Sequence, residues 1–282
     1  MKILVTGASG QLGSEIKELS INYTDGTFIF VDREEMALDN LTQVLSVIET
    51  IDPDLIISGG AYTAVDKAES EAELVDVINH RAVATMAQWA KQNNRKLIHI
   101  STDYVFQGTS STALKEDEPT NPINVYGLSK QKGEEAIITS DADAIIIRTA
   151  WVYSSYGANF VKTMIRLMTD REEISVIGDQ IGSPTYAHDL AQVILKIAHS
   201  EKWAKGIYHF SNEGEISWYD FAVAIKELKN LACHIRPITT AEYPTAAKRP
   251  SYSLLDKTKI KQTFGVTVPE WKQSLSNMLA KI

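Results

Sequence analysis

The feature that most constrains this chain is its opening stretch, KILVTGASGQLG, over residues 2–13. Residues 3–5 form an apolar run that is too short for a helix and suits a strand buried on both faces of a sheet. Three glycines follow at a spacing of three, and then an amphipathic run begins: Gly7, Gly10 and Gly13. A strand, a glycine turn and a helix in that order form a pyrophosphate site, because the free N–H groups at the helix N-terminus bind anions. The stretch predicts a dinucleotide-binding unit; the alternative is an ordinary strand-to-helix turn that favours glycine.

Each glycine has a predicted role in such a unit. Gly7 permits the tight turn, Gly10 lets the backbone approach the pyrophosphate, and Gly13 lets the helix pack on its strand. An acidic residue, Asp32, ends the second apolar run, where a carboxylate can bind the adenosine ribose hydroxyls or simply close a turn. Arg33 follows and can pair with a 2′-phosphate. We therefore expect the chain to use both cofactors, with NADPH at least competitive with NADH.

Apolar runs typical of buried strands alternate with helical patterns through the first half of the chain. The runs lie at residues 27–31, 55–57, 96–101 and 144–148, and one long amphipathic helix is expected over residues 71–93. This alternation predicts an α/β fold, a Rossmann-type doubly wound parallel sheet built from right-handed βαβ units.

After Thr149 the regular alternation of strands and helices ends, and glycines separate shorter elements. We expect residues 1–150, with roughly 187–212, to form the dinucleotide-binding domain. Residues 151–186 and 213–282 are expected to form a smaller C-terminal substrate-binding domain. A binding cleft is then predicted at the carboxyl ends of the strands.

Composition excludes several classes of protein. The net charge of −8 argues against a nucleic-acid partner, and no run of 18 apolar residues predicts a membrane span. Met1 and Lys2 lead directly into the first strand with no signal peptide, so the cytoplasm is expected. Cys233 is the single cysteine, which excludes a disulfide within the chain, and no His/Cys cluster has zinc spacing.

A second group of residues predicts acid–base chemistry. Thr102 follows the fourth strand, and Tyr126 and Lys130 form a Tyr-x-x-x-Lys pair at the start of a helix. Residues four apart share a helix face, so the ammonium of Lys130 is expected near the phenol, where it would lower the tyrosine pKa from its usual value of about 10. Such a tyrosine is a credible general acid. About one such pair is expected by chance, so its order after the glycine loop and Thr102 makes it informative. His99, inside the fourth strand, is expected to be a packed histidine and not a ligand.

The sequence resembles the extended short-chain dehydrogenases/reductases and, within them, the dTDP-4-dehydrorhamnose reductase family. The resemblance covers almost the whole chain and rests on seven stretches in order: VTGASGQLG, AYTAVDKAE, STDYVFQG, NVYGLSK, RTAWVYSSYGANFVKTM, DQIGSPTY and RPSYSLLD. It implies transfer of a hydride from NADPH or NADH to C4 of dTDP-4-dehydro-L-rhamnose, giving dTDP-L-rhamnose for polysaccharide synthesis.

The resemblance also implies roles for individual residues. Those expected along the cofactor pyrophosphate are Gly7, Gly10, Gln11, Leu12 and Gly13. Those expected by the adenosine are Asp32, Asp39 and Asn40, and those flanking the nicotinamide are Ala61, Tyr62 and Thr63. Tyr126 would donate the proton, Lys130 would hold the nicotinamide ribose, and Thr102 would bind the substrate near its carbonyl. The remaining residues expected to contact the sugar nucleotide are Val65, Asp103, Tyr104 and Trp151, with Asn159 and Arg249 near its diphosphate.

The residues themselves leave some of these assignments open. Arg249 suits bidentate phosphate binding, but its pattern also fits a solvated surface arginine. Trp151 offers a flat face to a base or sugar, but it also fits a core position. Some members of the resembled family link dimers through glutamates around magnesium. Glu15 matches one of these, but His188 stands where another would be, so we expect no metal and either a monomer or a homodimer.

Three other functions share parts of this pattern. Another nucleotide-sugar 4-ketoreductase, for example one that gives 6-deoxy-talose, would carry the same motifs. An epimerase would share Tyr126 and Lys130 and would retain oxidised cofactor. A non-catalytic regulatory subunit of this fold would not need Tyr126, Lys130 and Thr102, which this chain has.

Overall fold

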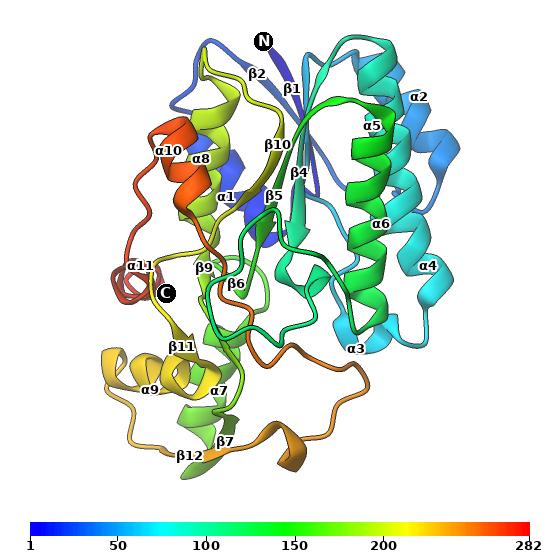
Figure 1. Ribbon diagram of the computed structural model, residues 1–282. Helices are drawn as coiled ribbons and strands as arrows, with labels where there is room; N and C mark the ends of the chain where they lie inside the picture. Colours follow the sequence, from blue (N-terminus) through cyan, green and yellow to red (C-terminus); the bar gives the residue numbers. More distant parts are fainter.

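A six-stranded parallel sheet forms the centre of the computed structural model, which describes residues 1–282 (Figure 1). Its strands run in the order β10-β5-β4-β3-β1-β2, and every neighbouring pair is parallel. Their bounds are β1 (Lys2–Thr6), β2 (Thr27–Val31), β3 (Leu55–Ser58), β4 (Lys96–Thr102), β5 (Asp143–Thr149) and β10 (Gly206–His209). The predicted doubly wound fold is confirmed, and the chain changes direction across the sheet between β1 and β3.

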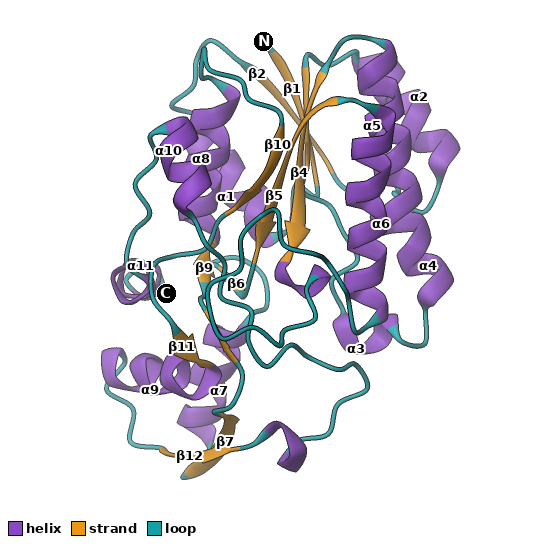
Figure 2. Cartoon of the chain, in the orientation of Figure 1, coloured by secondary structure: helices purple, strands orange, loops and turns teal.

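Helices cover both faces of this sheet (Figure 2). One face packs on α1 (Gln11–Ser20), α8 (Ala187–Ala198) and α10 (Thr258–Phe264), and the other on α2 (Leu41–Ile51), α5 (Ala82–Gln92) and α6 (Val125–Ser140). Successive strand residues point to opposite faces, so β4 places Ile98 in the first core and Leu97 in the second. β1 is buried as predicted. The prediction of a buried strand is wrong for β2, where Thr27 is exposed and residues 28–30 are partly exposed, because β2 is the edge of the sheet.

A smaller body lies beyond the carboxyl ends of the central strands, in the lower part of Figure 1. It contains three two-stranded sheets: β7 (Glu173–Ile177) with β12 (His234–Ile238), β8 (Ile181–Gly182) with β11 (Ile216–Ser217), and β6 (Val152–Tyr153) with β9 (Thr185–Tyr186). These surround a third core with α7 (Phe160–Asp170), α9 (Trp218–Leu228) and α11 (Trp271–Leu279).

The packing changes one predicted domain boundary. Ile260 and Phe264 of α10, followed by Val266 and Val268, pack in the core of the central sheet. Residues 258–268 therefore belong with the sheet and not with the smaller body. With this correction, we keep the division of the chain into a dinucleotide-binding and a substrate-binding domain as a proposal.

The long helix predicted over residues 71–93 is present but irregular. It consists of α4 (Ala72–Asp76), a π-helical turn η1 (Val77–Arg81) and α5. π turns of this kind insert one residue and often occur at functional sites. The remaining short helices are α3 (Val65–Ala68) and the 3₁₀ turns η2 (Asp103–Val105) and η3 (Thr240–Glu242). None of the helices has the length and apolarity needed to cross a membrane.

Candidate active site

The glycine turn lies at the point where the chain changes direction across the sheet. Gly7 has a φ of +73°, and a Cβ there would lie 2.7 Å from Cα of Gly60, which follows β3. A Cβ on Gly13 would collide with the carbonyl oxygen of Gly7, directly after β1, so glycine is needed where α1 approaches this turn. Gly10 is the N-cap of α1 and supplies no capping side chain. This leaves the first backbone N–H groups of α1 available to an anion, and the cradle fits a dinucleotide pyrophosphate.

The residues predicted beside the adenosine lie next to this turn. The carboxylate of Asp32 accepts a hydrogen bond from the backbone N–H of Ser9 at 3.0 Å. The guanidinium of Arg33 is 80% exposed and pairs with Asp39 at 2.8 Å. Asn40 caps α2 by accepting from the N–H of Gln43. Asn40 is therefore occupied as a helix cap, whereas the guanidinium of Arg33, although paired with Asp39, is exposed enough to meet a phosphate.

A buried asparagine holds the segment after β3 that contains Ala61, Tyr62 and Thr63. Asn79 accepts from the backbone N–H of Tyr62 at 2.8 Å and donates to its carbonyl at 3.0 Å. It also donates to the hydroxyl of Ser129, which in turn donates to the carbonyl of Tyr126. This side chain connects the predicted nicotinamide segment to the helix of the catalytic pair. Our sequence analysis missed it; the available signal was a polar residue inside a long amphipathic helix.

Thr102 and Tyr126 meet at the carboxyl edge of the sheet. Thr102 ends β4, and Tyr126 lies in the first turn of α6, whose N-cap Asn124 accepts from the N–H of Gly127 at 2.7 Å. The ring of Tyr104 meets that of Tyr126 edge-on, with centroids 5.7 Å apart. Burial raises the pKa of Tyr126 to about 12, although a hydrogen bond with Thr102 opposes this shift. The phenol is therefore protonated at neutral pH.

Lys130 is buried beneath the tyrosine, and its ammonium does not lie where the sequence predicted. Its Nζ donates to the carbonyl of Ile100 at 2.6 Å and lies 3.2 Å from Nε2 of His99. Burial lowers the pKa of Lys130 to about 8. A buried ammonium must find acceptors, and these two are within its reach. The prediction that Lys130 lowers the pKa of Tyr126 is wrong for this state of the protein.

Two charged residues predicted to bind the substrate also lie near this edge. Asp103 is buried, and burial raises the pKa of its carboxyl to about 6. Hydrogen bonds from Ser253 and Thr102 partly oppose this rise. Arg249 makes a two-pronged ion pair with Asp66 at 2.7 and 3.1 Å, and this pair lowers the pKa of the Asp66 carboxyl. Arg249 is therefore not a freely solvated arginine. Val65 begins α3 directly beside Asp66.

Trp151 and Asn159 have packing and capping partners of their own. The indole of Trp151 stacks on Trp218 with ring centroids 3.7 Å apart, and its backbone has an unusual φ of +49°. Asn159 caps α7 through the N–H of Lys162 and donates to Oε1 of Gln11 at 3.0 Å. Asn159 therefore links the smaller body to the glycine turn. Contact of either residue with a substrate stays a prediction.

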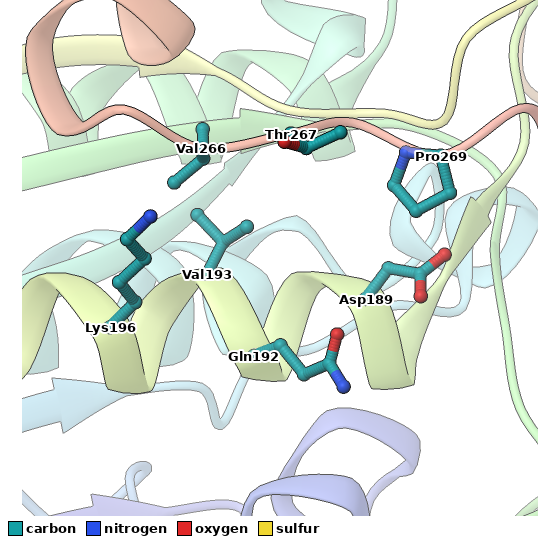
Figure 3. A pocket seen from close by; sticks show the side chains of 7 residues that line it. All are labelled: Asp189, Gln192, Val193, Lys196, Val266, Thr267 and Pro269. Carbon is teal, nitrogen blue, oxygen red and sulfur yellow. The ribbon is translucent and has the colours of Figure 1, made fainter.

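A small hollow elsewhere in the molecule is separate from these residues (Figure 3). It has a volume of about 120 Å³ and lies between α8 and the segment that precedes α11, on the face of the sheet opposite α6. Its lining is Asp189, Gln192, Val193, Lys196, Val266, Thr267 and Pro269. None of these is among the predicted site residues.

The structure shows no group of three or more His, Cys, Asp or Glu side chains placed to hold a metal ion. Glu15, the residue considered above for magnesium, is buried in α1. Its carboxylate accepts from the Ser154 hydroxyl at 2.5 Å and lies 3.0 Å from Nδ1 of His188.

Comparison with known proteins identifies the family. Residues 1–282 match the RmlD substrate binding domain family. The dTDP-4-dehydrorhamnose reductase of Aggregatibacter actinomycetemcomitans is 42% identical, over 99% of this chain and 98% of that protein. The dTDP-4-dehydrorhamnose reductase of Escherichia coli K12 is 36% identical, over 100% and 98%.

A solved structure agrees with these matches. The crystal structure of dTDP-4-dehydrorhamnose reductase from Bacillus anthracis in complex with NADP superposes with a TM-score of 0.95 at 40% identity. The match covers 100% of this chain and 99% of that one. Fold and sequence agree, and the chain belongs to the RmlD family of dTDP-4-dehydrorhamnose reductases.

Proposed function

We propose that this chain is an NADPH-dependent oxidoreductase that reduces the C4 keto group of dTDP-4-dehydro-L-rhamnose to give dTDP-L-rhamnose. Support for the proposal comes from Thr102 and Tyr126, which lie together at the sheet edge that also holds the glycine cradle, with Lys130 one turn further along the helix of Tyr126, in a chain of this family. The roles of the individual residues are part of the proposal.

NADPH, when bound, supplies the hydride. The residues of the chain then manage the proton and the orientation of the sugar. The C4 carbonyl carbon gains the hydride, and its oxygen takes the phenolic proton of Tyr126, leaving a phenolate. Thr102 orients the carbonyl by a hydrogen bond. Lys130 would hold the nicotinamide ribose through its ammonium, which points to the Ile100 carbonyl and His99 and not to the phenol.

Arg33 is proposed to give the preference for NADPH by binding its 2′-phosphate. Its guanidinium is exposed and pairs with Asp39 across the surface, where such pairs are weak, so it can turn to a 2′-phosphate. Asp32 lies beside it and suits the unphosphorylated ribose, so NADH remains a possible cofactor. The NADP bound to the Bacillus anthracis relative supports this order.

The substrate diphosphate is proposed to meet Arg249. Asp66 holds this guanidinium in a fixed plane, and such pre-orientation reduces the entropy lost when two phosphate oxygens bind. We include Asp103 and Tyr104, in the turn after β4, and Val65, at the start of α3, in the same proposed substrate site.

One assay separates this function from its nearest alternatives. Oxidation of NADPH is measured with a panel of dTDP-, UDP- and GDP-linked 4-keto-6-deoxy sugars, and the products are analysed by NMR for their C4 configuration. We expect the dTDP sugar to react fastest and to give the rhamno product. Formation of 6-deoxy-talose would show a different 4-ketoreductase. An absorbance spectrum showing tightly retained oxidised cofactor, with no net reduction, would show an epimerase.

We propose that the protein works in the cytoplasm as a monomer or homodimer. Nucleotide sugars are small charged molecules, and the net charge of −8 gives no general attraction to nucleic acid. Light scattering coupled to size exclusion distinguishes the two assemblies.

A further inference from the structure

We propose that His99 is a positioning residue for Lys130: its neutral imidazole accepts a hydrogen bond from the ammonium and holds it beneath the active site. This inference rests on the proposed function, in which Lys130 binds the nicotinamide ribose. His99 is fully buried in β4, between two apolar neighbours, where the sequence predicted only a packed side chain.

The register of the sheet places three groups in a row. Ser58 on β3 and His99 on β4 are direct partners in the ladder, so their side chains lie side by side on one face. Nδ1 of His99 is 3.0 Å from the Ser58 hydroxyl, and its Nε2 is 3.2 Å from Nζ of Lys130. Leu97, on the same face of β4, packs in the core that α6 shares. The row therefore crosses from β3 through β4 to the helix that contains Tyr126.

The chemistry of the row fixes the protonation of the imidazole. An ammonium has three donors and no acceptor, so Nε2 of His99 must carry the lone pair that faces Lys130. The proton is then on Nδ1 and is donated to the hydroxyl of Ser58. Burial and the adjacent positive charge both lower the pKa of His99 well below its usual range, in agreement with a neutral ring.

These contacts fix the direction in which the ammonium of Lys130 points. Its four-carbon stem is flexible, and burial alone would not select one orientation of the ammonium. The carbonyl of Ile100 and Nε2 of His99 take two of its three donors. The third donor is left for the cofactor ribose. Without His99, the ammonium keeps one acceptor, and the buried charge would be held less firmly.

Two substitutions separate this role from simple packing. His99→Phe keeps a flat aromatic ring, somewhat larger than imidazole, but removes the acceptor, and His99→Gln restores an amide oxygen that can accept. For His99→Phe we expect kcat to fall by about ten-fold or more and the Kd for NADPH to rise, as for a lost hydrogen bond to a charge. For His99→Gln we expect most of both losses to be recovered.

A matched control uses the same strand face. Ser101, two residues further along β4, donates to Glu134 and makes no hydrogen bond to Lys130. Ser101→Ala is expected to lower stability while leaving the Kd for NADPH close to that of the parent protein. Equal effects of Ser101→Ala and His99→Phe on the Kd would overturn the proposal, because both would then report only a loosened interface between β4 and α6.

The tautomer gives a test that requires no sugar substrate. The chain has six histidines, and ¹⁵N–¹H correlation spectra of protein labelled at histidine, assigned by loss of a signal in His99→Gln, report the tautomer of each. We expect His99 to be neutral with its proton on Nδ1, and its Nε2 resonance to move in Lys130→Met. A proton on Nε2, a charged ring, or a resonance unmoved by Lys130→Met would overturn the proposal.

These readouts keep two failures apart. If NADPH binds and the spectra show the expected tautomer but no keto-sugar is reduced, the proposed function fails and the role of His99 stands. If the sugar is reduced normally by His99→Phe, the role of His99 fails and the function stands. Should His99→Phe not fold, the spectra of the parent protein and of Lys130→Met decide the question.

Discussion

At the scale of single residues, the site depends on two buried groups whose pKa values burial moves in opposite directions. Tyr126 rises to about 12 and Lys130 falls to about 8. The phenol therefore keeps its proton throughout the neutral range. The ammonium loses its charge as the pH rises through about 8, so in the proposed mechanism Lys130 would limit activity on the alkaline side.

This gives a prediction for pH dependence. A lysine is charged below its pKa, and the proposed mechanism needs the charge, so kcat/KM for NADPH should fall as the pH rises through about 8. The groups nearest to Lys130 are the neutral His99 and, one turn further along α6, Glu134, which raises the lysine pKa. Initial rates between pH 6 and 10 check this. A profile that stays flat to pH 10 would contradict the requirement for a charged Lys130.

Arg33 gives a second prediction at this scale. Arg33→Ala removes the only partner proposed for the 2′-phosphate, so KM for NADPH should rise by about 10- to 100-fold, as for a lost hydrogen bond between charged groups. KM for NADH should change little. Parallel titrations with both cofactors check it, and equal losses for the two would show that Arg33 does not read the phosphate.

Asn79 gives a third prediction, which concerns stability. Asn79→Leu keeps the approximate volume but leaves the backbone N–H and carbonyl of Tyr62 and the hydroxyl of Ser129 without their partner. Each unsatisfied buried group costs about 1–3 kcal/mol, so the free energy of unfolding should fall by at least that amount. Urea unfolding measures it. Unchanged stability together with unchanged KM for NADPH would show that the nicotinamide segment is held by other contacts.

At the scale of elements, the turn between β1 and α1 is tightly determined by packing. Gly7→Ala combines a positive φ with a Cβ that would lie 2.7 Å from Gly60, so it should disrupt cofactor binding. Gly178→Ala is the matched control, because its Cβ would meet neighbours only at 3.6 Å or beyond and its φ is not positive. Quenching of intrinsic fluorescence by NADPH checks both variants. Parent-like binding by Gly7→Ala would show that the turn can move aside without loss.

The buried strands are the part of the structure that the sequence predicted most accurately. Strand runs such as residues 96–101 and 144–148 match β4 and β5 closely, because buried parallel strands are continuous apolar runs that local sequence reveals. The exposed edge of β2 could not be read this way, since edge position depends on which strands pair. The π turn at Asn79 was also missed, because the helical period continues on both sides of it.

For the site residues too, the sequence predicted local features and missed those that depend on distant parts of the chain. The spacing of Tyr126 and Lys130 predicted that they share a helix, but it did not predict that the ammonium would turn to His99 and Ile100. That choice depends on β4, which is distant in sequence. Likewise, Arg249 could not be distinguished from a surface arginine, because its partner Asp66 lies 183 residues earlier in the chain.

For the molecule as a whole, we predict that neither the activity nor the assembly depends on a metal ion. The Glu15 carboxylate already accepts from Ser154 and faces His188, and magnesium prefers several oxygen ligands. EDTA should therefore leave the rate of NADPH oxidation and the elution volume on size exclusion unchanged. A shift in elution on chelation that magnesium reverses would contradict this.

In the proposed mechanism Tyr126 donates the proton to the sugar oxygen, and single-turnover oxidation of NADPH with saturating dTDP-4-dehydro-L-rhamnose measures this step. Tyr126→Phe keeps the ring but removes the acid, and general acid catalysis is worth about 10²- to 10⁴-fold. We expect a rate lower by that factor with nearly unchanged affinity for NADPH. If Tyr126→Phe reduces the sugar at close to the parent rate, the proton comes from another group and the assignment of the active site is wrong.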